Sequence, residues 1–155
     1  MLVRKNIVHR STLESGGNTG TNADMRFGDM TRMPEYRQAD DDYLVTASAM
    51  LAELYRLDLR GLTMDRFVSA KIVVTCRYIS ILMASILKSK GIPARCRSGF
   101  APYFTTNGQA WDHWVNEYWN GDRWVRIDVD GCLSLSGDAI DPFDMATDAE
   151  SPFIV

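Results

Sequence analysis

The chain has 155 residues, of which 46% are hydrophobic and 10% aromatic, so it can bury one ordinary core. Its 17 basic and 20 acidic residues give a net charge of -3 and are mostly interspersed, which leaves no basic surface for a phosphate backbone. We therefore expect a single domain over residues 1–155 that does not bind nucleic acid.

The chain contains no apolar run long enough for a signal peptide or a membrane-spanning helix. Its three cysteines, Cys76, Cys96 and Cys132, are odd in number and widely spaced, which argues against a disulfide framework and fits a reducing compartment. These features predict a soluble, cytoplasmic protein with at least one free thiol and no membrane partner.

The first half of the chain predicts a loop and then a helix. Residues 14–34 are rich in Gly, Asn, Thr and Asp without an apolar period, which indicates an extended loop. Three acids at 40–42 then precede an apolar pattern that ends at Gly61, so we expect a helix between them. Its apolar residues at helical spacing are Leu44, Ala47, Leu51, Leu54 and Tyr55. Residues 62–74 are ambiguous, because their last three residues favour a strand while 64–70 could form a helical turn.

The second predicted helix begins at Cys76. Thr75 is a plausible N-cap, and Gly91 and Pro93 end the helix after two lysines in its last turn. The apolar stripe consists of Ile79, Leu82, Met83, Ile86 and Leu87. Cys76 therefore occupies the first helical position, where the positive end of the helix dipole favours a thiolate.

Three runs with strand character follow, at residues 94–104, 110–119 and 122–130. The segments between them, Thr-Thr-Asn-Gly-Gln and Asn-Gly, are both hairpin signals. A helix followed by an antiparallel meander predicts an α+β fold.

The Asn120-Gly121 pair predicts a type I′ turn, which places His113 directly opposite Asp128 on the neighbouring strand. Residues directly opposite each other have Cβ atoms about 5 Å apart, so the Asp128 carboxylate can accept a hydrogen bond from the His113 imidazole. The alternation of the two strands puts one set of residues on one face: Trp114, Tyr118, Val125, Ile127 and Val129. The other face carries His113, Val115, Glu117, Trp124, Arg126 and Asp128, and is too polar for an ordinary core.

A thiol at a helix N-terminus and a histidine oriented by a carboxylate together make a nucleophilic site of the Cys-His-Asp type. Here the three residues are Cys76, His113 and Asp128. Such a site requires the helix to bring the thiol to the hairpin.

Three stretches carry a resemblance to a known family: "VTCRYISILMASILKSKGIPARCRSGFAPYF", "DHWVNEYW" and "RWVRIDVD". They resemble the transglutaminase-like superfamily, in particular a bacterial branch, over residues 72–130, with weaker likeness in "MLAELYRLD" and "DPFDM". The resemblance implies a papain-like core with Cys76 as nucleophile, His113 as general base and acid, and Asp128 as its orienting partner. It also implies acyl chemistry at an amide through a thioester, as in cysteine proteases and transglutaminases.

The chain departs from the family pattern in two respects. Transglutaminases often use a tryptophan upstream of the cysteine to donate to the oxyanion, whereas the first tryptophan here is Trp111. The backbone N–H of Cys76 could supply one donor, and the second is unassigned. The tail after residue 143 also stops earlier than expected. His9, in a polar N-terminal stretch, is expected to be exposed.

Other roles for these residues stay open. Cys76 could be a small buried hydrophobe, His113 a satisfied core histidine and Asp128 a strand end. A zinc site from Cys76, Cys96, His113 and Cys132 lacks paired spacing, so we expect no metal and no cofactor. Candidate substrate-binding residues are Arg77, Tyr103, Trp111 and Trp114, and Arg95 and Arg97 could bind a substrate carboxylate or form salt bridges.

The function expected from the sequence is therefore cysteine-dependent attack on a peptide or other amide. Hydrolysis is slightly favoured over transfer to an amine, because nothing marks an amine-acceptor site. The alternative is an inactive transglutaminase-like domain that binds a protein partner through the aromatic hairpin and the 14–34 loop.

Overall fold

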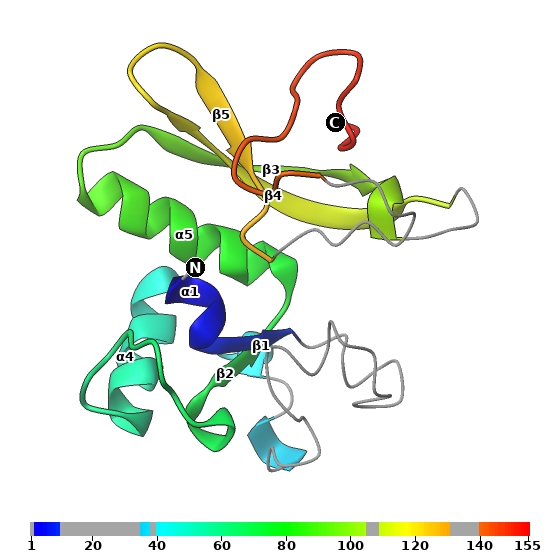
Figure 1. Cartoon of the computed structure of the whole chain (residues 1–155). Helices are drawn as coiled ribbons and strands as arrows, with labels where there is room; N and C mark the ends of the chain where they lie inside the picture. Colours follow the sequence, from blue (N-terminus) through cyan, green and yellow to red (C-terminus); the bar gives the residue numbers. More distant parts are fainter. Residues whose placement is uncertain (1, 10–34, 38–39, 105–108, 131–139) are drawn as a thin grey trace. The chain divides into compact units, whose positions relative to one another are not determined.

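The computed structural model describes residues 2–9, 35–37, 40–104, 109–130 and 140–155 (Figure 1). The predicted loop at 14–34 and Cys132 lie outside these residues. The chain divides into two compact units, Met1–Leu82 and Met83–Val155, with the division inside helix α5. Within the described part of the chain, no helix has the length and apolar character needed to span a bilayer.

The first unit contains a parallel pair of short strands. β1 (Ile7–His9) follows the short helix α1 (Leu2–Lys5) and pairs with β2 (Ile72–Val74), in the register that sets His9 beside Val74. Ile7, Val8 and all three residues of β2 have no exposed surface. The sequence predicted β2 only as one of two alternatives and did not predict β1, because three residues are too few to show a period.

Helix α4 (Ala47–Leu57) begins later than the acidic run predicts. The Thr46 side chain caps it by accepting from the N–H of Ala49, whereas the three acids form a separate turn, η3 (Asp40–Asp42). Asp40 instead accepts from the backbone N–H of Val73 in β2. The buried residues of α4 are Met50 and Leu54, and Tyr55 on the predicted apolar face is 53% exposed. Two further single turns are η2 (Glu35–Arg37) and η4 (Val68–Ala70).

Helix α5 (Cys76–Ser89) begins at the predicted residue and ends one residue before Lys90, which was expected in its last turn. The carbonyl of Thr75 accepts from the N–H groups of Tyr78 and Ile79 and so closes the first turn. At the other end, Gly91 adopts a φ of 75°, which glycine does without steric cost. Its N–H donates to Lys88 and that of Ile92 donates to Leu87, an arrangement that satisfies the last carbonyls of the helix.

The second unit is a three-stranded antiparallel meander in the order β3-β4-β5. Its strands are β3 (Ala94–Ala101), β4 (Trp111–Trp119) and β5 (Trp124–Ile127). β3 ends earlier than predicted, because Pro102 begins the 3-10 turn η5 (Pro102–Phe104) and has no N–H to continue the ladder. Helices and an antiparallel sheet confirm the α+β prediction.

The β4-β5 hairpin differs from the prediction by two residues. Trp119 lies opposite Trp124, not Asp122, so four residues at 120–123 form the connection. Asn120 does not sit in a two-residue turn: its side-chain oxygen accepts from the N–H groups of Asp122 and Arg123. A shift by an even number keeps every side chain on its predicted face, because the strand period is two.

The C-terminal segment covers the face of the meander that carries His113, Val115 and Arg126. Ile154 pairs with Phe100 in β3, and Met145 pairs with Arg126 in β5. A Cβ on Gly99 would clash with the carbonyl oxygen of Ile154, so this approach requires glycine. The buried cluster beneath the segment comprises Ala101, Tyr103, Val115, Met145 and Phe153.

Candidate active site

A buried histidine-carboxylate pair lies on this covered face. His113 in β4 is 2% exposed, and Asp128, which directly follows β5, is 1% exposed. His113 Nε2 lies 3.0 Å from Asp128 Oδ2. The predicted contact is therefore present, although the shifted register sets Asp128 diagonal to His113 instead of opposite.

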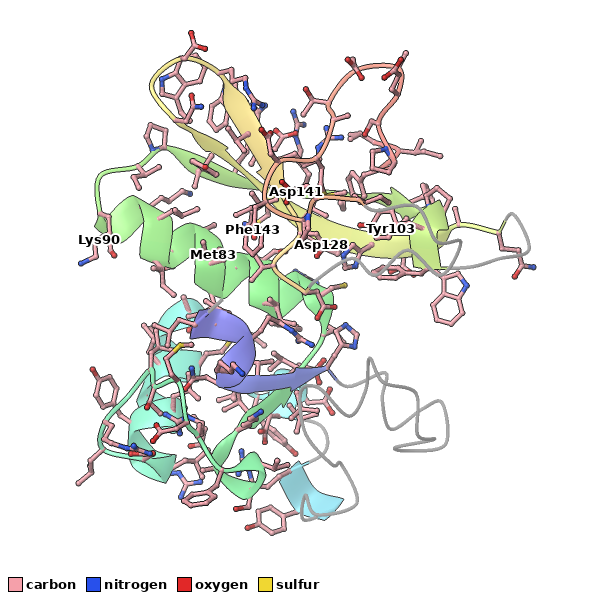
Figure 2. All side chains as sticks on the ribbon, viewed as in Figure 1. Met83, Lys90, Tyr103, Asp128, Asp141 and Phe143 are labelled. Carbon is pink, nitrogen blue, oxygen red and sulfur yellow. The ribbon has the colours of Figure 1, made fainter. Side chains whose placement is uncertain are left out.

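The Asp128 carboxylate is held from three directions. Its Oδ2 also accepts a hydrogen bond of 2.9 Å from the Tyr103 hydroxyl, and its Oδ1 accepts one of 3.0 Å from the N–H of Asp130. The backbone N–H of Asp128 donates to the carbonyl of Pro142 over 2.8 Å. Figure 2 labels Tyr103, in η5, and Asp128, which follows β5. A carboxylate fixed in this way can orient the imidazole and stabilise its protonated form.

Aromatic rings surround the imidazole. The Phe104 ring stands edge-to-face with it, with centroids 4.7 Å apart and planes at 88°, and the rings of Tyr103 and Phe153 lie at 6.3 and 6.4 Å. These contacts restrict rotation of His113 and reduce the access of water to its bond with Asp128.

Cys76 lies in the first unit, at the first position of α5, and is 9% exposed. Its backbone N–H donates to His9 Nε2 over 3.0 Å. The prediction that His9 is exposed is wrong: its ring is half-buried, because β1 pairs with β2 and ends beside the start of α5. His113, Asp128 and Tyr103 are brought together in the second unit, and the approach of the Cys76 sulfur to His113 stays a prediction.

The predicted substrate-binding residues have different environments. Trp111 is 59% exposed on β4 and Trp114 is half-buried, whereas Tyr103 is buried with its hydroxyl bonded to Asp128. Arg77, next to Cys76, is exposed, with its guanidinium 5.6 Å from the centre of the Tyr78 ring. The orienting contact of Tyr103 was missed from the sequence, because the turn η5 that places it has no periodic signal.

Arg95 and Arg97 form salt bridges. Together with Arg126 they surround the Glu117 carboxylate, at 2.7, 3.0 and 3.0 Å respectively. Burial of Glu117 opposes its ionisation, but the hydrogen bonds from the three arginines outweigh burial and hold the pKa of Glu117 below its ordinary value.

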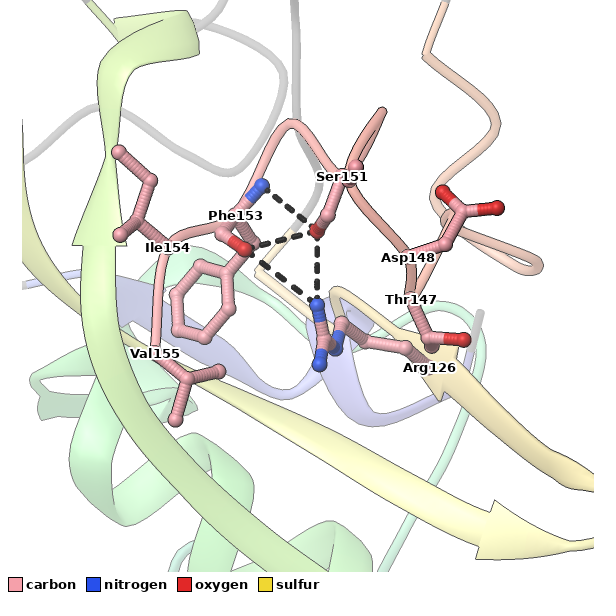
Figure 3. Close-up of a pocket in the computed structure, with 8 residues that line it drawn as sticks. Arg126, Thr147, Asp148, Ser151, Phe153, Ile154 and Val155 are labelled. Carbon is pink, nitrogen blue, oxygen red and sulfur yellow. Dashed lines mark hydrogen bonds between the residues drawn. The ribbon is translucent and has the colours of Figure 1, made fainter.

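Arg126 also holds the C-terminal segment. Its Nη1 donates to Ser151 Oγ over 2.8 Å and to the carbonyl of Phe153 (Figure 3). An open pocket of about 290 Å³ lies here, lined by Arg126 and residues of the segment 147–155. Neither His113 nor Asp128 lines this pocket. The contacts of Arg126 there serve to attach the C-terminal segment, which covers the two residues.

Of the four residues considered for a zinc site and not favoured for it, Cys132 lies outside the described residues. Burial raises the pKa of Cys96, whose sulfur accepts a long contact of 3.8 Å from Asn116. Among the described residues, no group of three or more His, Cys, Asp or Glu side chains is placed to hold a metal ion.

Comparison with known proteins identifies the family. The family model described as "Transglutaminase-like superfamily" matches residues 30–129, which is more than half of the chain. The chain therefore belongs to the transglutaminase-like superfamily. Neither the search of curated proteins nor that of solved structures gave a match.

Proposed function

We propose that the protein is a thiol enzyme that attacks an amide carbonyl with Cys76, using His113 and Asp128 as its proton-transfer pair. The observation that carries the proposal is the buried 3.0 Å contact between His113 Nε2 and Asp128 Oδ2. A neutral imidazole that donates from Nε2 carries its basic lone pair on Nδ1. That nitrogen accepts the proton of the thiol.

In the first half of the reaction, the Cys76 sulfur bonds to the carbonyl carbon and the C=O electron pair moves to the oxygen. When the tetrahedral intermediate collapses, the C–N bond breaks, and the amine leaves with the proton from His113 Nδ1. The acyl group is then held as a thioester.

In the second half, water attacks the thioester carbon while His113 takes one of its protons. Collapse then breaks the C–S bond and releases a carboxylic acid and the thiol. We favour water over an amine acceptor, because no described feature forms a dedicated amine site. The substrate is a peptide or another amide-containing molecule.

The proposal can be tested by measuring how fast the Cys76 thiol is alkylated. Wild-type protein is treated with iodoacetamide at neutral pH, and the modified residues are identified by mass spectrometry. Cys96 provides an internal control, because burial raises its pKa and should make it slow to react. We expect rapid alkylation at Cys76, slower alkylation in His113→Ala, and none at that position in Cys76→Ala.

A second measurement tests acyl transfer directly. Incubation with p-nitrophenyl acetate should release p-nitrophenolate in a burst and leave an acetyl group on Cys76. Inertness of Cys76 to both reagents in folded protein would contradict the proposal and favour a non-catalytic binding domain.

A further inference from the structure

The backbone N–H of Cys76 already has a hydrogen-bond acceptor in this structure. His9 Nε2 lies 3.0 Å from the Cys76 nitrogen. In an attack by the adjacent thiolate, this N–H is the donor nearest to the oxygen on which negative charge develops. The imidazole nitrogen of His9 therefore occupies the side of the Cys76 amide where the substrate oxygen would bind.

The fold explains why His9 is there. β1 runs parallel to β2, with His9 beside Val74, and only Thr75 separates Val74 from Cys76. The ends of both strands thus point to the N-terminus of α5. Ile7 and Val8 have no exposed surface and anchor β1, while the His9 ring at its end is half-buried.

We infer that His9 is the second oxyanion donor of the site, acting together with the backbone N–H of Cys76. This inference rests on the proposed function. In the resting site, Nε2 accepts from Cys76, so the ring proton is on Nδ1. When a carbonyl oxygen enters between the two nitrogens, the imidazole exchanges that proton with solvent and donates from Nε2, with no net gain or loss of protons.

This assignment makes His9 a catalytic residue of a chain that has no tryptophan before Trp111. Acylation creates negative charge on a carbonyl oxygen, so it needs both donors. Alkylation by iodoacetamide displaces iodide at a saturated carbon and creates no oxyanion. The two reactions at the same sulfur therefore separate the role of His9 from the reactivity of Cys76.

The test uses the full chain with His9→Leu, His9→Gln and, as a matched control, Lys5→Leu at an exposed position of the same N-terminal segment. Rates of acylation by p-nitrophenyl acetate and of alkylation by iodoacetamide are compared on the high-pH plateau, where the thiolate is fully formed. His9→Leu should lower acylation about 10²-fold and leave alkylation unchanged. His9→Gln, whose amide can both accept and donate, should recover most of the loss, and Lys5→Leu should match wild type.

Two outcomes would overturn the inference. Equal falls in acylation and alkylation in His9→Leu would show that His9 only supports the start of α5. Faster acylation in His9→Leu would show that His9 obstructs the site and does not donate. Inert Cys76 in wild-type protein would instead remove the proposed function itself, so the two failures are distinguishable.

Discussion

Tyr103 and His113 bind the same oxygen atom. The Tyr103 hydroxyl donates to Asp128 Oδ2 over 2.9 Å, and His113 Nε2 lies 3.0 Å from it. Tyr103→Phe removes one of these contacts and leaves the ring in place. Because a hydrogen bond to a charged group contributes about 1.5–3 kcal/mol, we expect acylation of Cys76 to fall by about tenfold or more, up to about 10²-fold. Tyr43→Phe, at a position 79% exposed, is the control, and an unchanged rate in Tyr103→Phe would show that Asp128 needs no such support.

Asp128→Asn tests the tautomer of His113. An amide in place of the carboxylate can present N–H to Nε2, which moves the imidazole proton to Nδ1, where it cannot accept from the thiol. We expect acylation by p-nitrophenyl acetate to fall about 10³-fold or more. Asp122→Asn, in the exposed hairpin connection, should be neutral. A rate close to wild type in Asp128→Asn would contradict the assignment of Asp128.

Glu117→Gln tests the arginine cluster. The substitution removes the charge that the buried Arg126 and the partly exposed Arg95 and Arg97 share. We expect the free energy of unfolding, measured with urea, to fall by about 3 kcal/mol. This value is at the lower end of the range for breaking a buried ion pair, because Arg95 and Arg97 reach solvent. Glu150→Gln, at an exposed position, should have no effect.

The lowered pKa of Glu117 predicts how the free energy of unfolding responds to acid. Its folded pKa lies below the ordinary value of 4.5, so its stabilisation is fully present above that pH and is lost as the pH falls through the folded pKa. Unfolding curves from pH 6 downwards should therefore show a smaller acid-induced loss in Glu117→Gln than in wild type. An identical pH dependence in both proteins would contradict the depressed pKa.

The lowered pKa of Lys71 predicts a change in the free energy of unfolding at alkaline pH. Burial, with further contributions from Arg4, Lys5 and Arg66, lowers the pKa of Lys71 from 10.5 to about 8. The unfolded chain therefore binds more protons between these values, and the free energy of unfolding should rise with pH across that interval, by on the order of 3 kcal/mol. The rise should disappear in Lys71→Met and persist in Lys90→Met, whose side chain is exposed.

The sequence predicted those parts of the structure that have a period or a stop signal. The boundaries of α5 follow from an apolar stripe ended by Gly91 and Pro93, and the faces of β4 and β5 follow from alternation. The predicted register of the hairpin was wrong, because the Asn120 side chain accepts hydrogen bonds from the N–H groups of Asp122 and Arg123 in a four-residue connection. His113 still contacts Asp128, since a shift of two residues preserves the face.

The features missed from the sequence share one property: they depend on contacts between segments distant in the chain. β1 has three residues, and His9 acquires its position only through pairing with β2. The C-terminal segment has no regular period, and its place is set by single bridges to Phe100 and Arg126. Local propensity contains no information on such pairings.

The pairing of β1 with β2 bears on how the protein can be shortened for laboratory work. The family match covers residues 30–129, but β1, His9 and the carbonyl of Pro142 that holds the Asp128 backbone lie outside it. A fragment trimmed to those limits would uncover the apolar side of Ile72, Val73 and Val74 and leave the meander without its terminal cover. Such a fragment should aggregate or fail to react, and that result would say nothing about the chemistry of the intact chain.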